Sequence, residues 1–196
     1  DEDISERAGP LEQVNVSRVQ QVEAAVGEDD PSPEGALVLH ASDRFGQANL
    51  SCIGDYARPK AMMLGVRGFP GNSISHANSF FVPSHNTRVF KDGECDVVCS
   101  IGYNPARLAK GYSLDEVDIR LVITDLCVMD FRGPDYQLRL RSLHPGITVE
   151  QVQQNTGFPV CVPDDVVTTP APTAEQLAII RRMDPHNLRA RELKDN

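Results

Sequence analysis

Residues 64–86 read LGVRGFPGNSISHANSFFVPSHN and combine a glycine-rich middle with apolar sequence at both ends. Gly65, Gly68 and Gly71 recur at every third position, and Pro70 precedes the last of them. Glycine allows positive φ angles, and successive backbone N–H groups in such a loop can form a concavity that binds anions. We therefore predict a polar loop between two buried strands and place the candidate site in this loop.

Six polar side chains follow within positions 72–79, and two titratable groups of the segment suit substrate binding. His76 can carry a proton or donate a hydrogen bond to a substrate carbonyl, and Arg67 can pair with an anionic group. A histidine held in a turn and a surface arginine are equally compatible with the sequence. Residues 64–86 contain no Asp or Glu, so an enzyme that needs a carboxylate must take it from another segment or another chain.

The other motifs favour structural roles over catalysis. The glycine pattern is neither a Walker loop nor a dinucleotide-binding fingerprint, and no GxSxG motif occurs. Tyr56, Arg58 and Lys60 can contact nucleotide-like phosphates, although a solvated loop is the simpler interpretation. We expect structural or turn-forming roles for two histidines and two aspartates, which are His85, His144, Asp125 and Asp130.

The acidic residues are concentrated at the start of the chain. Residues 1–34 hold ten acids and two arginines, whereas the whole chain of 196 residues has a net charge of −9. The remainder is nearly neutral and lacks the basic face of a nucleic-acid-binding protein. We interpret residues 1–34 as an acidic arm with a short amphipathic helix over 10–26 and a linker. Residues 35–196 are long enough for one α/β domain with a sizeable core.

Cysteine usage and hydropathy indicate a cytoplasmic protein. The five cysteines are odd in number and form no CxxC pair, which favours free, buried thiols in a reducing compartment. No histidine pair stands at zinc spacing near Cys95 and Cys99, so we expect no metal site. The sequence has no run of about 18 apolar residues and does not open with a signal peptide, so we expect no membrane segment.

The remaining pattern predicts strands followed by capped helices. Thr148 and Thr173 each stand three positions before a glutamine, which is the capping-box signature of a helix start. We expect these helices to end at Gly157 and Met183. Apolar or alternating runs predict strands over residues 36–40, 62–66, 79–82, 96–103 and 158–163, and an antiparallel meander over 119–125, 127–131 and 137–143. Together these elements predict an open α/β or α+β sheet.

Four stretches of the sequence together resemble one known family. They are FGQANLSCIGDYARPKAMMLGVRGFPGNSISHANSFFVPSHNTRVF at 45–90, CDVVCSIGY at 95–103, ITDLCVMDF at 123–131 and LRSLHPGITVEQVQQNTGFPVCVPDD at 140–165. From about residue 37 to about residue 191 the chain resembles the β subunit of family I CoA transferases of the glutaconate-CoA-transferase type. It is similar in particular to the β subunit of the steroid ring-opening acyl-CoA hydrolase, which shares the transferase fold.

The resemblance implies an open mixed α/β sheet of the CoA-transferase type, with an antiparallel meander and C-terminal helices. It also implies an α-type partner subunit, an α2β2 assembly, and an acyl-CoA substrate in a cleft between subunits. Coenzyme A would enter as part of the substrate, and no separate cofactor is implied. The portion that family members place before residue 36 is replaced here by the acidic arm, so we expect either a fragment or a trimmed subunit that depends on its partner.

The resemblance further implies how the chemistry is divided between subunits. In transferases a glutamate attacks the thioester, and in many members it stands in a Glu-Ser-Gly or Glu-Asn-Gly segment of the β subunit. Neither segment occurs in this sequence, whereas in the ring-opening hydrolases the α subunit carries the working glutamate. We therefore expect a β-type subunit that, with a base from its partner, opens the ring of a cyclic β-keto acyl-CoA by hydrolysis. The alternatives are a CoA transferase with a glutamyl-CoA intermediate and a non-catalytic scaffold subunit.

Transferred to this chain, the expected site lies along the glycine-rich stretch. Catalytic roles, in which donors polarise the substrate carbonyl, fall to His76, Asn78 and Arg67. Substrate-binding roles fall to the neighbouring glycines and small polar residues, which are Gly68, Gly71, Asn72, Ser73 and Ser75.

Overall fold

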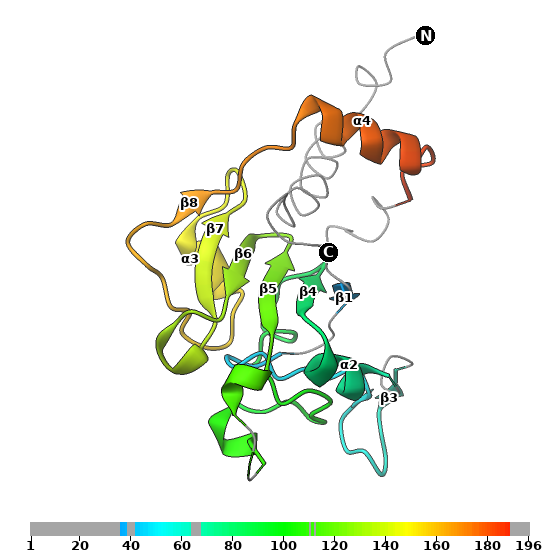
Figure 1. The fold of residues 1–196 in the computed structure, drawn as a ribbon, viewed down its shortest axis with the longest axis vertical. Helices are drawn as coiled ribbons and strands as arrows, with labels where there is room; N and C mark the ends of the chain where they lie inside the picture. The colour runs from blue at the N-terminus through cyan, green and yellow to red at the C-terminus, as the bar shows by residue number, and fades with distance from the viewer. Residues whose placement is uncertain (1–35, 39–41, 64–67, 110, 112, 189–196) are drawn as a thin grey trace.

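A six-stranded mixed sheet forms the centre of the computed structural model, which describes residues 36–38, 42–63, 68–109, 111 and 113–188 (Figure 1). Across the sheet the strands are β1 (Ala36–Val38), β4 (Asn78–Val82), β5 (Ile119–Thr124), β6 (Cys127–Asp130), β7 (Arg139–Leu143) and β8 (Val167–Thr168). Strands β1, β4 and β5 are parallel, β5 to β7 form an antiparallel meander, and β8 returns parallel to β7. The predicted mixed α/β sheet and its meander are therefore confirmed.

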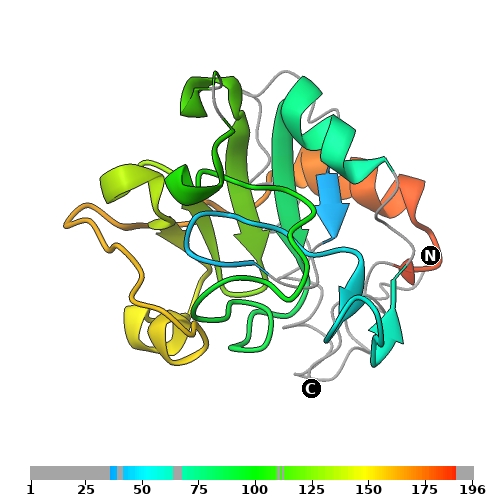
Figure 2. The same ribbon diagram turned by 90° about the horizontal axis from the view of Figure 1, so that it is seen from below.

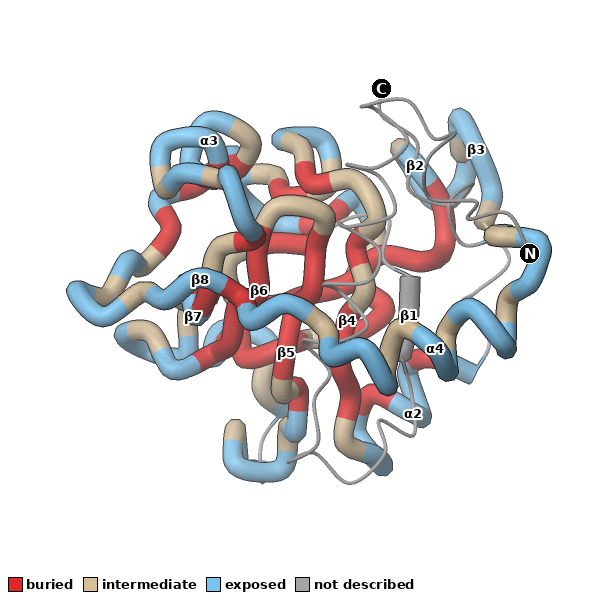
Figure 3. Tube along the Cα trace, turned by 90° about the horizontal axis from the view of Figure 1, so that it is seen from above, coloured by how far each residue is buried: buried red, intermediate tan, exposed pale blue. Residues whose placement is uncertain are grey.

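Strand burial follows the hydrophobic pattern of the sequence. Every residue of β6 is buried, as is every residue of β5 except Arg120, so these two strands are covered on both faces. Strand β7 instead alternates, with Leu140 buried and Arg141 exposed, as the period-two pattern predicts. Figure 3 shows the buried residues concentrated along β4 to β7, whereas the tube of the C-terminal helix is mostly exposed.

Short helices and a small hairpin surround the sheet. The hairpin pairs β2 (Cys52–Ile53) with β3 (Ala61–Met62), and the helices are α2 (Phe69–Ser75), α3 (Val149–Gln154) and α4 (Ala174–Met183), with single 3-10 turns η2 (Pro105–Arg107), η3 (Leu114–Glu116) and η4 (Pro134–Tyr136). Both predicted capping boxes are present, since Thr148 and Thr173 each exchange backbone and side-chain hydrogen bonds with the glutamine three residues later. Seen from below, α2 lies along the side of the sheet that carries β1 and β4 (Figure 2).

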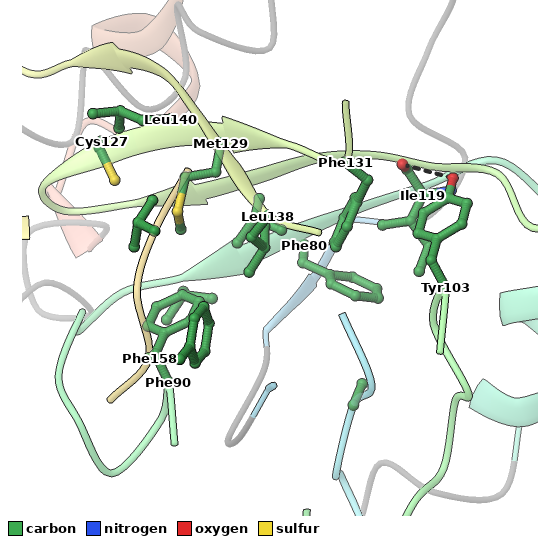
Figure 4. Close-up of a cluster of buried hydrophobic side chains, with 14 of the residues drawn as sticks. Phe80, Phe90, Tyr103, Ile119, Cys127, Met129, Phe131, Leu138, Leu140 and Phe158 are labelled. Carbon is green, nitrogen blue, oxygen red and sulfur yellow. Dashed lines mark hydrogen bonds between the residues drawn. The ribbon is translucent and has the colours of Figure 1, made fainter. Parts of the chain in front are cut away.

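The main core lies on one side of the meander. Phe80, Met129, Leu138 and Leu140 are almost inaccessible to solvent, and they belong to one buried cluster with Phe90 and Phe158 (Figure 4). The Tyr103 hydroxyl connects this core to the start of β5, because it donates to the carbonyl oxygen of Ile119 and accepts from the Ile119 N–H at 3.0 Å.

Two predicted strands are wrong. Residues 96–103 contain no regular strand and make only a bridge to Ala48. The chain turns at Gly102 (φ +53°), where an added Cβ would lie 2.3 Å from the carbonyl oxygen of Phe45. Residues 158–163 form a single bridge, at Cys161, since the prolines at both ends of this short run remove ladder donors. The sequence pattern also missed β8. The acidic arm, its expected helix and residues 39–40 and 64–66 of the expected strands lie outside the described residues.

Candidate functional site

Helix α2 occupies the middle of the stretch that was predicted to be a loop. It begins at Phe69, and Pro70 stands in its first turn, where the missing N–H breaks no helical hydrogen bond. Gly68 has right-handed angles (φ −95°, ψ −23°), and a Cβ added to Gly68 or Gly71 would meet no atom of the described residues within 4 Å. These two glycines therefore leave the surface of α2 open rather than form a left-handed loop. Gly65 lies outside the described residues.

Asn78 ties the end of α2 to the start of β4. Its buried Nδ2 donates to the carbonyl oxygen of His76 at 2.6 Å and to that of Asn72 at 3.3 Å. Its Oδ1 is also buried and has no hydrogen-bond partner among the described residues. The amide protons that we assigned to a substrate carbonyl are thus engaged at the helix end, and the catalytic role of Asn78 stays a prediction.

The other candidate residues divide between two sides of α2. Asn72, Ser75 and His76 are exposed together with the two described glycines, so the helix brings these five candidates to one surface. Ser73 turns inward and donates its hydroxyl hydrogen to the carbonyl oxygen of Pro70 at 2.9 Å. Arg67 lies outside the described residues.

A cavity of about 530 Å³ lies beside α2, between the helix and the segment that carries η2 and η3. Pro70, Ser73 and Ile74 form the helix side of this α2 cavity. No sequence pattern predicts this cavity, because the connection before β5 looks polar and variable. The available signal was the Ser113-to-Glu116 spacing, which is a further capping box and indicates an ordered turn.

Charged groups at the α2 cavity are already paired. Arg107, on its wall, makes two hydrogen bonds to the Glu94 carboxylate, and this pairing lowers the pKa of Glu94. Glu116, also on the wall, accepts the Ser113 N–H at 3.3 Å. Among its described residues, the wall therefore offers neither an isolated cation nor a carboxylate free of protein contacts.

Two buried histidines confirm the structural roles that we expected for them. His85 lies between the hydroxyls of Thr124 (3.1 Å from Nδ1) and Thr156 (2.9 Å from Nε2), and its burial lowers its pKa to about 3. His144 contacts the Thr169 hydroxyl at 3.0 Å and the Thr124 carbonyl oxygen at 2.9 Å. Both hydrogen-bond networks contact Thr124, which is the last residue of β5.

The expected turn aspartates and solvated loop are also as predicted. Asp125 accepts the His85 N–H at 2.8 Å. Asp130 accepts the Arg132 N–H at 3.0 Å and pairs with Arg139 of the neighbouring strand at 2.7 Å. The three residues of the loop between β2 and β3 that were considered for phosphate contacts, Tyr56, Arg58 and Lys60, are exposed.

All five cysteines are free thiols, and burial raises the pKa of Cys95 and of Cys127 to about 12. Such thiols are poor nucleophiles at neutral pH. Within the described residues no three His, Cys, Asp or Glu side chains gather as metal ligands would. Among the described residues, no helix is both long enough and apolar enough to cross a membrane.

Known proteins are similar to this chain in fold and in sequence. No protein-family model matches the chain. A 3-oxoadipate CoA-transferase subunit of Pseudomonas knackmussii is 32% identical over 151 residues, which are 76% of this chain and 58% of that protein. The crystal structure of Rhodococcus jostii RHA1 IpdAB superimposes with a TM-score of 0.74 at 40% identity, covering 82% of this chain and 64% of that one. The chain is thus homologous to CoA-transferase subunits of the β type and shares their fold.

A more specific likeness lies within this group. The cholesterol ring-cleaving hydrolase IpdB subunit of Rhodococcus jostii is 43% identical over 158 residues. The match includes 77% of this chain and 59% of that subunit. The chain therefore spans about three fifths of the length of the relatives that it matches, and the family resemblance expected from the sequence is confirmed.

Proposed function

We propose that the chain is the β-type subunit of a hetero-oligomeric enzyme that opens the ring of a cyclic β-keto acyl-CoA by hydrolysis. The observation that carries this proposal is the 43% identity with the IpdB subunit of a cholesterol ring-cleaving hydrolase. An α-type partner, an α2β2 assembly and a cytoplasmic location belong to the same proposal. Coenzyme A is part of the substrate, and the proposal needs no separate cofactor.

The exposed surface of α2 supports a divided site, because it carries polar groups without a base. Residues 68–86 contain no carboxylate, and Glu116 on the α2 cavity is engaged in a capping box. We assign the base to the α subunit, where it removes a proton from water. The resulting hydroxide adds to the ring ketone, and the bond to the α-carbon of the thioester breaks. The electron pair passes into a thioester enolate, which takes the proton back at carbon, while Asn72 and His76 orient the substrate.

The second candidate is a CoA transferase, and the 32% identity with a 3-oxoadipate CoA-transferase subunit favours it. Covalent transfer needs a glutamate nucleophile. Since the sequence holds no Glu-Ser-Gly or Glu-Asn-Gly segment, that glutamate would also come from the partner. Borohydride traps a glutamyl-CoA thioester, so trapped label on either subunit would favour the transferase.

The experiment is to produce the chain together with an α-type subunit and to assay a cyclic β-keto acyl-CoA for ring opening. We expect ring opening by the complex and, for His76→Ala, a loss on the order of 10²-fold in kcat. The matched control is His186→Ala, at an exposed histidine beyond the end of α4. A complex that exchanges CoA between acids without opening the ring would contradict hydrolysis, and unchanged activity of His76→Ala would contradict the role of α2.

A further inference from the structure

The α2 cavity has the size and lining of a site for an apolar group. Its volume of about 530 Å³ lies within the range of small-molecule sites, about 300 to 1,000 Å³. Carbon atoms contribute most of its surface, through the apolar residues Pro70, Ile74, Ile101, Leu108, Ala109 and Val117.

The polar groups on the wall have protein partners. Arg107 is paired with Glu94, and the Ser73 hydroxyl donates to a carbonyl oxygen within α2. Ser113 and Glu116 satisfy each other in the capping box of η3. Because the charged groups on the described wall are already paired, they attract a charged ligand less strongly than isolated charges would, whereas an apolar ligand leaves their hydrogen bonds intact.

Ile74 adds exposed apolar surface at the edge of the cavity. It lines the cavity and is 63% exposed, and the half-buried Ile101, Leu108 and Val117 also line the cavity. An isolated exposed isoleucine is ordinary in a protein surface. Beside an apolar cavity, however, the same side chain would be removed from water when a hydrocarbon group binds, which favours binding.

We infer that the α2 cavity binds the hydrocarbon part of the acyl group of the acyl-CoA substrate, and that it prefers bulky alicyclic groups. This inference rests on the proposed function. The cavity shares α2 with the candidate site, since Asn72, Ser75 and His76 lie on the exposed side of the helix that Pro70 and Ile74 line on the cavity side. A substrate whose carbonyl meets the polar side of α2 can therefore extend its hydrocarbon part into the cavity.

The test compares a small and a bulky thioester on the complex with its α-type subunit. Titration calorimetry measures the Kd of acetyl-CoA and of cyclohexanecarbonyl-CoA. We expect the natural complex to bind the cyclohexyl thioester at least about tenfold more tightly, because it buries more hydrocarbon. Ile74→Ser should weaken the cyclohexyl thioester about fivefold and acetyl-CoA less than about twofold. Leu108→Ala, at a second wall position, should change the ratio in the same direction.

Ile179→Ser is the matched control, because Ile179 is 40% exposed on α4, towards the opposite end of the molecule from α2 (Figure 1). It should leave both Kd values unchanged. Equal weakening of both thioesters by Ile74→Ser would overturn the inference while leaving the proposed function intact. Loss of the α-type subunit from the Ile74→Ser complex, with an unchanged Kd ratio, would also overturn it and identify a subunit contact. If neither thioester binds the natural complex, the proposed function fails as well.

Discussion

Acid should destabilise this protein through His85, which is buried and neutral. The residue is 5% exposed, its ring centroid lies 4.2 Å from that of Phe90, and two threonine hydroxyls contact its ring nitrogens. Its pKa falls from 6.5 to about 3 on folding, so the unfolded chain takes up a proton first as the pH falls. The stability contributed by neutral His85 is therefore present above about pH 6.5 and is lost progressively as the pH falls towards 3.

The size of this effect follows from the two pKa values of His85. At 1.36 kcal/mol per pKa unit, protonation of the unfolded chain alone should cost about 2 kcal/mol between pH 7 and pH 5. Urea unfolding of the full chain at both pH values measures this loss. His85→Gln cannot take up the proton, so its stability should fall about 2 kcal/mol less over the same interval, although it is less stable at pH 7. His186→Gln, at an exposed histidine, is the control. An equal fall for the natural chain and His85→Gln would refute the reasoning.

Three further substitutions test the local structure, each by urea unfolding of the full chain. Gly102→Ala should lower the free energy of unfolding by about 3 kcal/mol, because its φ is +53° and a backbone oxygen lies 2.3 Å from the new Cβ. Gly93→Ala, at φ +81° with no described atom within 4 Å of the new Cβ, should lower it by about 1 kcal/mol. Equal losses would contradict the close approach at Gly102. Asn78→Asp loses the two hydrogen bonds that the Asn78 Nδ2 donates at the end of α2, and this should lower the free energy of unfolding by about 2 kcal/mol or more. The exposed Asn72→Ala should lower it by less than about 0.5 kcal/mol. Unchanged stability of Asn78→Asp would show that these two hydrogen bonds do not stabilise the helix end. Thr173→Ala should cost about 1 kcal/mol and Thr173→Ser much less, because serine keeps the capping hydroxyl; equal losses would show that the hydroxyl does not cap the helix.

The meander and the capped helices could be predicted because their signals are local. In strand β7 buried residues alternate with exposed or half-buried ones over five positions, and β5 and β6 are nearly continuous apolar runs. Thr148 and Thr173 stand beside the glutamines with which they form capping boxes. In each case, residues close in sequence make the deciding contacts.

The remaining features depend on contacts between residues distant in sequence, or on a residue type that occurs in two kinds of local structure. Pro70 and the glycines around it suggested a loop, yet proline also suits the first turn of a helix, and the seven residues of α2 are too few to show a helical period. Residues 96–103 look like a strand, but they make only one bridge, from Ser100 to the distant Ala48, and no regular ladder. The α2 cavity joins segments 25 to 47 positions apart in the sequence, so no local pattern predicts it. The roles of Arg67 and of the exposed α2 residues stay predictions.

The source of the oxygen in the product tests the proposed hydrolysis most directly. The complex of this chain with an α-type subunit is supplied with a cyclic β-keto acyl-CoA in water enriched in ¹⁸O, and the product is analysed by mass spectrometry. Water addition to the ring ketone predicts one ¹⁸O in the new carboxylate and a thioester that stays intact. An unopened ring, with CoA moved to an acceptor acid through a borohydride-sensitive glutamyl thioester, would contradict the account.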